Sequence, residues 1–177
     1  MEKTIGTDLL FEGRVWRFGD WISGDSHVLQ FSDMKDFAGS QDEAALAARC
    51  FAEVDPNFAR EVKQGDILVA GKGFGLPSHP PVPIALRASG IAVVVVESTD
   101  TAFTRRCLNE ALPVMTCPGI LGLVAHGETL RVDLETGLVA NVSTGRTAQG
   151  SAFSPRMLSV YRAGGILKYL ENVHGVP

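Results

Sequence analysis

The sequence has few cysteines and no cysteine motif. Cys50, Cys107 and Cys117 are scattered, and no Cys-x-x-Cys pair occurs. An odd, scattered set does not indicate a disulfide framework, and an iron–sulfur cluster usually needs four cysteine ligands. The His, Asp and Glu residues also form no cluster with the spacing of a metal site. We therefore expect this chain to bind no metal and no other cofactor by itself.

Long hydrophobic runs and basic clusters are also absent. The longest apolar run, Ile91–Val96, is too short to cross a bilayer, and the opening MEKTIGTDLLFEG lacks the apolar core of a signal peptide. The chain has 16 Lys and Arg against 20 Asp and Glu, a net charge of -4. Nucleic-acid-binding proteins usually carry a basic patch instead. We expect a cytoplasmic protein that binds neither nucleic acid nor membrane.

The chain is long and apolar enough to form a core of its own. Its 177 residues are 45% hydrophobic, which predicts one domain spanning residues 1–177. The run IAVVVV at 91–96 is the clearest strand, because a continuous β-branched run is typical of a strand covered on both faces. Strands are also predicted at 13–18, 28–31, 67–70 and 112–115, and helices at 42–51, 57–62, 83–89 and 99–111.

The pattern changes at about residue 123. Turn signals, each with a glycine, follow one another at 126–128, 135–137 and 144–145. They separate short predicted strands at 129–134 and 138–142, and helical segments follow at 155–163 and 166–170. The last third is therefore expected to be a β-meander followed by a terminal helix. Together with the strand–helix–strand order before it, this predicts an α/β fold.

A glycine-rich segment, VAGKGFGLPS at 69–78, joins a predicted strand to a predicted helix. Its glycines let the backbone turn tightly and approach a ligand, and a helix N-terminus can offer free N–H groups to an anion. The spacing fits neither the dinucleotide fingerprint nor a P-loop. Two interpretations stay open: a tight strand–helix connection, or a ligand site. In the second case the lining residues are Gly73, Phe74, Gly75 and Leu76.

Two pairs of polar residues are candidates for chemistry. Ser78 and His79 are adjacent, but neighbours in an extended chain point to opposite sides, and a catalytic serine needs a base within reach. Asp20 and Asp25 share a glycine-containing loop and form a candidate pair of carboxylates. Each pair also has an ordinary interpretation: the proline-rich loop at 77–83 holds Ser78 away from a site, and Asp20 and Asp25 belong to a solvated turn.

Short segments over nearly the whole chain match one family in order and spacing. They are GRVWRFGDWI at 13–22, GDILVAGK at 65–72, ALR at 85–87, GIAVV at 90–94, VDLETG at 132–137 and AGGILKYL at 163–170. Ser98, Phe103 and Asn109 fall in step with a further family pattern, in which Arg106 occupies the position of an asparagine. In these segments the chain resembles the small subunit of 3-isopropylmalate dehydratase, which corresponds to the swivelling domain of aconitase.

The resemblance implies an α/β fold of the swivelling β/β/α type. It implies a hydro-lyase subunit that is inactive without a large subunit, which carries a [4Fe–4S] cluster. The family removes and re-adds water on hydroxy di- or tricarboxylic acids, as in leucine biosynthesis. In that chemistry the cluster iron acts as a Lewis acid, and a serine of the swivelling domain takes the proton. The expected partners are thus a large subunit and a small hydroxy acid, and the isolated chain is a candidate for self-association.

The loop that carries the family's serine differs in this chain. The family pattern GCGSSREHAPxAL has two serines and a substrate-binding arginine, whereas residues 75–86 read GLPSHPPVPIAL, one residue shorter and without arginine. We assign the base role to Ser78 and the arginine's role to His79. The residues expected around the substrate are Gly73, Phe74, Gly75, Leu76, Asp20 and Asp25.

Two other functions remain open beside an active subunit with an altered substrate or mechanism. One is a catalytically degenerate paralogue that acts as a partner-binding or regulatory domain. The other is a free-standing small-molecule binding domain, which fits only a chain without a large subunit. A resemblance of fold does not by itself decide among them.

Overall fold

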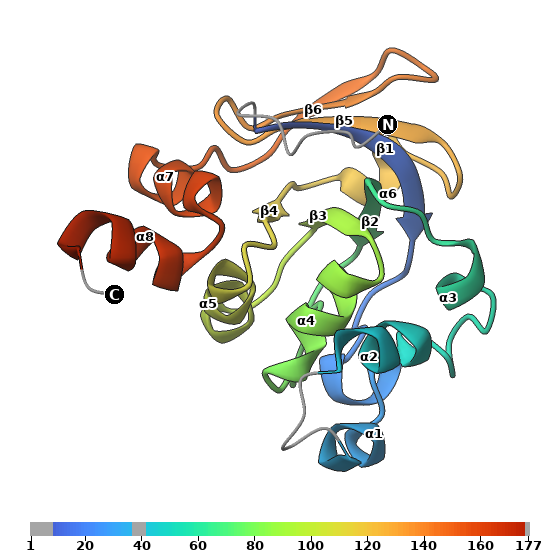
Figure 1. Cartoon of the computed structure of the whole chain (residues 1–177). Coiled ribbons are helices and arrows are strands. Elements are labelled where there is room, and N and C mark those ends of the chain that lie inside the picture. Colours follow the sequence, from blue (N-terminus) through green and yellow to red (C-terminus); the bar gives the residue numbers. More distant parts are fainter. Residues whose placement is uncertain (1–8, 37–41, 176–177) are drawn as a thin grey trace.

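A computed structural model describes residues 9–36 and 42–175. Its centre is a seven-stranded sheet in the order β4-β3-β2-β1-β5-β6-β7 (Figure 1). Four strands pair in parallel: β1 Leu10–Arg17, β2 Asp66–Ala70, β3 Ile91–Val96 and β4 Val114–Thr116. Three more continue from β1 as an antiparallel meander: β5 Thr129–Asp133, β6 Leu138–Asn141 and β7 Thr147–Gln149.

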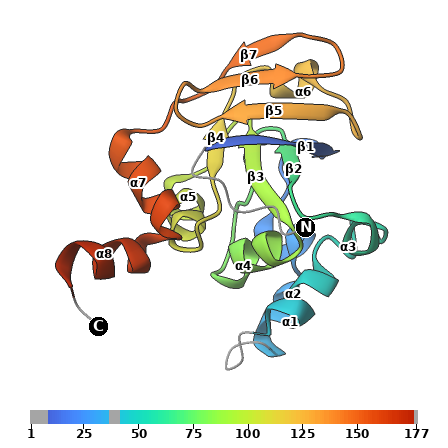
Figure 2. The same cartoon turned by 45° about the horizontal axis from the view of Figure 1, so that its top comes forward.

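The helices lie on both sides of the parallel strands. In chain order they are a π-helical turn at Gly24–Val28, α1 Phe31–Asp36, α2 Glu43–Arg49, α3 Phe58–Glu61, α4 Pro81–Ala88, α5 Thr101–Asn109, α6 Ile120–Leu123, α7 Pro155–Ala163 and α8 Ile166–His174. Helices α1 to α5 cover one face, while α6, α7 and the curled meander cover the other (Figure 2). Within the described ranges, no helix has the length and apolar character that crossing a membrane would require.

The parallel strands are buried on both faces, as their sequence predicts. Trp16, Leu68 and Val94 point into the core under α1 to α5. Their neighbours along the chain, such as Ile67 and Val93, point into the core under the meander. Successive side chains of a strand alternate between faces, so a strand covered on both sides must be apolar throughout. The α/β fold class is therefore confirmed.

One predicted strand is wrong. Residues 28–31 do not extend into a strand, because the Val28 and Leu29 N–H groups donate to the carbonyls of Ser23 and Gly24. These bonds span five residues, close the π-helical turn, and bury Val28 and Leu29 as a strand would. The apolar residues of this short segment therefore indicated burial and not an extended backbone. Three further short elements, α1, α6 and β7, were not predicted from the sequence, and neither was the π-helical turn itself.

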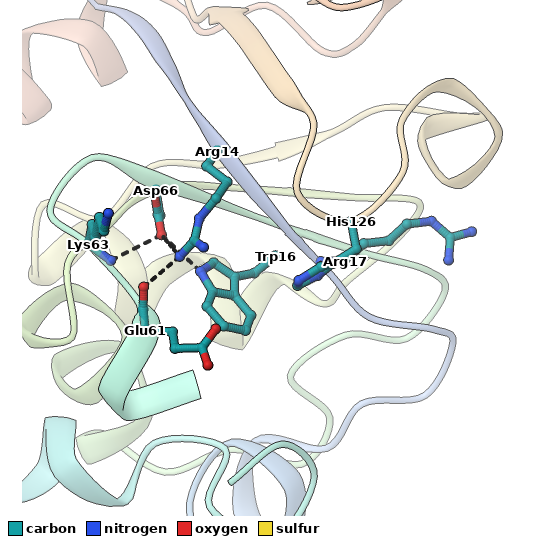
Figure 3. A network of polar contacts seen from close by, with 7 residues as sticks. All are labelled: Arg14, Trp16, Arg17, Glu61, Lys63, Asp66 and His126. Carbon is teal, nitrogen blue, oxygen red and sulfur yellow. Dashed lines mark hydrogen bonds and ion pairs between the residues drawn. The ribbon is translucent and has the colours of Figure 1, made fainter. Parts of the chain in front are cut away.

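A buried carboxylate joins β1 to the start of β2 (Figure 3). Asp66 is only 4% exposed, and its Oδ2 accepts hydrogen bonds from Trp16 Nε1 and Arg14 Nη2, both at 2.9 Å, and from Lys63 N at 3.0 Å. Arg14 Nη2 also donates to the Glu61 carbonyl at 2.6 Å. A buried carboxylate with three donors is satisfied, so the network ties both strands and the end of α3 together.

Replacing Asp66 by alanine should lower the free energy of unfolding by about 2–4 kcal/mol, because it leaves buried donors without an acceptor. Urea unfolding of the isolated chain measures this loss. Arg131→Ala is the matched control: it breaks the exposed Arg131–Glu12 ion pair between β5 and β1 and should cost less than about 1 kcal/mol. Equal losses in the two variants would show that the buried network stabilises the fold no more than an exposed ion pair does.

Candidate functional site

Two segments that follow β1 and β2 lie against each other at the carboxyl edge of the parallel strands. This edge is where ligands commonly bind in open α/β sheets. Four backbone hydrogen bonds join the segments: Gly71 N to Gly19 O (3.0 Å), Trp21 N to Lys72 O (2.7 Å), Gly75 N to Ile22 O (2.7 Å) and Asp25 N to Pro77 O (3.2 Å). The two segments are thus fixed to each other residue by residue.

Glycine is required at two points of this contact. Gly73 has a φ of +66°, and an added Cβ would lie 2.3 Å from the Trp21 ring. A Cβ on Gly24 would lie 2.6 Å from the Cβ of Ser78. Neither position has room for a side chain, so these glycines bring the two segments, and with them Ser78, to their places.

The glycine-rich loop uses its own N–H groups internally. Beside the bonds of Gly71 and Gly75, Lys72 N donates to Asp20 Oδ1 (2.8 Å), Gly73 N to Ser98 Oγ (3.1 Å) and Phe74 N to Ser98 O (3.1 Å). All five N–H groups of residues 71–75 therefore have partners within the protein. The structure thus favours the tight strand–helix connection over a backbone cradle for an anion.

The start of α4 offers no anion site either. Pro80, Pro81 and Pro83 have no N–H, and Val82 N donates to the His79 carbonyl at 3.1 Å. The expectation of free N–H groups at this helix start is wrong, because proline removes them. These positions therefore offer no N–H group to a negatively charged ligand, and the positive charge for one at this edge has to come from side chains.

The Phe74 side chain is not placed to bind a substrate. It is fully buried, with its ring 5.5 Å from the Phe103 ring, and its carbonyl accepts from Thr99 Oγ1 at 2.7 Å. The predicted substrate contact of the Phe74 side chain is therefore wrong, because the ring between the two glycines turns into the core. Substrate contacts by Gly73, Gly75 and Leu76 stay predictions.

Ser78 and His79 have different partners, although they are adjacent in sequence. Ser78 is 8% exposed, and its Oγ accepts a hydrogen bond from Arg106 Nη1 at 3.2 Å. His79 is 53% exposed, and its Nδ1 lies 2.7 Å from Asp25 Oδ2. The second oxygen of Asp25 is buried without a partner in the part of the chain that the structure describes.

The two predicted carboxylates do different things. Asp25 pairs with His79, as described above. Asp20 is exposed, and its Oδ1 accepts from the Lys72 N–H of the glycine-rich loop. Asp20 therefore stabilises the turn, as the ordinary interpretation had it, whereas Asp25 orients a candidate catalytic side chain.

Two residues at this site were not predicted from the sequence. Arg106 lies in the last turn of α5 and reaches Ser78 from a segment far along the chain. Its only sequence signal was the departure from the asparagine of the family pattern. Trp21 is 68% exposed and has a φ of +58°, which is rare for a residue with a side chain. The sequence feature that could have identified Trp21 is a tryptophan inside a polar, turn-rich loop.

A shallow cavity of about 370 Å³ lies elsewhere, beside α6 and the turn that follows β6. Arg17, His126 and Arg146 help to line it, and none of the predicted site residues does. Both guanidinium groups already donate to carbonyls, Arg17 to Leu121 O and Arg146 to Gly122 O, each at 3.0 Å. We therefore place the candidate site at the open edge around Ser78.

The three cysteines do not fit a metal cluster. All are buried, and burial raises the pKa of each thiol, that of Cys117 to about 11. They lie singly, at the end of α2, within α5 and after β4. Among the described residues, no group of three or more His, Cys, Asp or Glu side chains is placed to hold a metal ion.

Comparison with known proteins identifies the family. No family model matches the sequence. The chain is 35% identical over 163 residues to the 3-isopropylmalate dehydratase small subunit of Aquifex aeolicus, which covers 91% of this chain and 94% of the relative. This chain belongs to the 3-isopropylmalate dehydratase small-subunit family. The resemblance seen in its sequence segments is thereby confirmed.

Other members of the family match over similar lengths. The 2,3-dimethylmalate dehydratase small subunit of Eubacterium barkeri is 32% identical, over 90% of this chain and 96% of the relative. The crystal structure of 3-isopropylmalate dehydratase from Methanocaldococcus jannaschii superposes with a TM-score of 0.84 at 26% identity and covers 93% of this chain and 95% of that one. The fold expected for this family is therefore the fold observed.

Gly24→Ala should destabilise the chain, because the new Cβ meets Ser78 at 2.6 Å and the Pro77 carbonyl at 3.0 Å. Overpacking of this kind typically costs about 1–3 kcal/mol. Gly19→Ala, in the same segment, is the control, since a Cβ there meets nothing within 4 Å. Thermal unfolding compares the two variants, and an unchanged Tm for Gly24→Ala would contradict the close approach.

The native thiols should react slowly with iodoacetamide at pH 7, because only thiolates are nucleophilic and burial disfavours the charged form. With a pKa of about 11, Cys117 should gain reactivity about tenfold per pH unit below that value. Mass spectrometry follows the alkylation, and all three thiols should react after unfolding in guanidinium. Rapid labelling of the native chain at pH 7 would refute this.

Proposed function

We propose that this chain is the small subunit of a heteromeric hydro-lyase, inactive alone, that removes and re-adds water on a substituted malate. The observation that carries the proposal is its 35% identity, along 91% of the chain, to a 3-isopropylmalate dehydratase small subunit. Small subunits imply a larger partner. We assign the [4Fe–4S] cluster to that partner, since the described residues here offer no ligand set.

Ser78 is the proposed base. Removing water from a hydroxy acid requires a base to take a proton from the carbon next to a carboxylate, and a serine can do so only where its alkoxide is stabilised. Ser78 is largely shielded from water, and the Arg106 guanidinium donates to its Oγ. A positive charge at this distance favours the deprotonated hydroxyl, and exclusion of water strengthens the effect.

His79 is the second proposed catalytic residue. Its Nδ1 is bonded to Asp25, so the ring has a fixed orientation, and Nε2 is the nitrogen that can reach a ligand. The His79 side chain is half exposed on the same loop as Ser78. Once a partner subunit covers this edge, Nε2 is in a position to exchange a proton with a bound hydroxy acid.

A non-catalytic subunit is the second candidate function. Two observations favour it: the loop lacks the family's arginine, and the N–H groups of residues 71–75 are all donated within the protein. Such a chain would bind its partner and regulate it without turnover of its own.

Co-expression with a cluster-bearing large subunit separates the two functions. The names of the relatives supply the substrates to test: 3-isopropylmalate, 2,3-dimethylmalate and citramalate. The hydro-lyase proposal expects turnover of at least one acid by the pair of chains and none by either chain alone. A stable but inactive pair would support the non-catalytic subunit instead.

In an active pair, Ser78→Ala should lower kcat by about 10²–10⁴-fold, the usual cost of losing a general base, with little change in KM. Ser159→Ala is the control, because its hydroxyl donates to the Pro155 carbonyl within α7, away from Ser78. Steady-state kinetics of both variants provide the test. Near-normal turnover by Ser78→Ala would remove Ser78 from the mechanism.

A further inference from the structure

A hydroxy dicarboxylic acid needs a cationic group to bind each carboxylate, and arginine serves this need best because its fork donates two parallel hydrogen bonds. The loop at 75–86 has no arginine. Pro80, Pro81 and Pro83 have no N–H group, and the N–H groups of residues 71–75 are hydrogen-bonded within the protein. The positive charge beside Ser78 must therefore come from another segment.

Arg106 is that charge. It is half-buried, and one of its five N–H donors is used on Ser78 Oγ. Within residues 9–36 and 42–175, no carboxylate forms an ion pair with it, whereas Arg14, Arg87 and Arg131 each have an acidic partner. A partly desolvated guanidinium without a counter-ion gains most from binding an anion.

His79 cannot supply the same charge. Its Nδ1 lies 2.7 Å from the Asp25 carboxylate, so the pair is neutral when the imidazole is protonated and negative when it is not. In either state the pair brings no net positive charge to a substrate carboxylate. Arg106 brings a net positive charge to a carboxylate and the His79–Asp25 pair does not, so Arg106 fits the role of the missing arginine better than His79 does.

We infer that Arg106 binds a carboxylate of the hydroxy acid and so holds the neighbouring C–H group against Ser78. This inference rests on the proposed function and names the residue that recognises the substrate. Because Arg106 bonds Ser78 directly, a carboxylate on its remaining donors lies next to the proposed base. The cation has moved from the loop to α5, where the family pattern has asparagine.

The kinetic test uses the two-chain complex. Arg106→Gln should raise KM by about 10–100-fold, the loss expected for charge-assisted hydrogen bonds, and should also lower kcat. The KM of Arg106→Lys should lie between those of the wild type and Arg106→Gln, because lysine keeps the charge without the two-pronged donor geometry. Added guanidinium ion should partly restore substrate binding, and so lower the KM, in Arg106→Ala. Arg105→Gln, its exposed neighbour on α5, is the control and should leave KM unchanged. His79→Gln should raise KM by less than Arg106→Gln.

If the complex is active and Arg106→Gln keeps a normal KM, the inference is overturned while the proposed function stands. If Arg106→Gln lowers kcat alone, Arg106 acts only on Ser78, and the inference is also overturned. The inference is supported if KM rises in Arg106→Gln, rises less in Arg106→Lys, and falls in Arg106→Ala when guanidinium is added. Neither unfolding nor a purely structural role predicts that rescue.

A binding measurement covers the case of an inactive complex. Citramalate is titrated into the full chain labelled with ¹⁵N, and the Arg106 Nε signal is followed by NMR. A saturable shift of the Arg106 Nε signal supports the inference even though the hydro-lyase proposal fails. Arg106→Gln is the control: the other signals that move in the wild-type chain should no longer respond to citramalate. No shift in the wild-type chain, together with no turnover, overturns both.

Discussion

The site depends on the close backbone contact between the segment after β1 and the segment after β2. Parallel pairing of the two strands brings their carboxyl ends together, and the buried Asp66 network fixes the same two strands at the start of β2. From there the segments run side by side, bonded from Gly19–Gly71 to Asp25–Pro77. This contact puts Asp25 under His79 and Gly24 against Ser78.

The same contact decides how the site can act. The N–H groups of residues 71–75 are all hydrogen-bonded within the protein, so this stretch is a rigid support whose own backbone donors are not free for an anionic ligand. We propose that recognition falls to side chains from separate segments: Asp25 after β1, Ser78 and His79 after β2, and Arg106 on α5. The glycines shape the site, and in our proposal the charges come from elsewhere in the chain.

Local patterns in the sequence predicted the elements that depend on local rules. The β-branched run Ile91–Val96 is a doubly covered strand, and the segment Pro155–Ala163 is a helix, as predicted. The position of the glycine loop was also predicted. The Arg106–Ser78 contact was not, because it joins residues 28 apart through the packing of α5, which no periodicity reports. Phe74 was misplaced for a related reason: neither its spacing nor its neighbours show which way a loop side chain turns.

The most direct test of this account is a crystal structure of the chain with its large subunit and a bound hydroxy acid. The account predicts a carboxylate within hydrogen-bond distance of the Arg106 guanidinium and the ligand's acidic C–H carbon beside Ser78 Oγ. A ligand held instead by Arg17 and Arg146 in the cavity near α6, with Ser78 and Arg106 untouched, would contradict it.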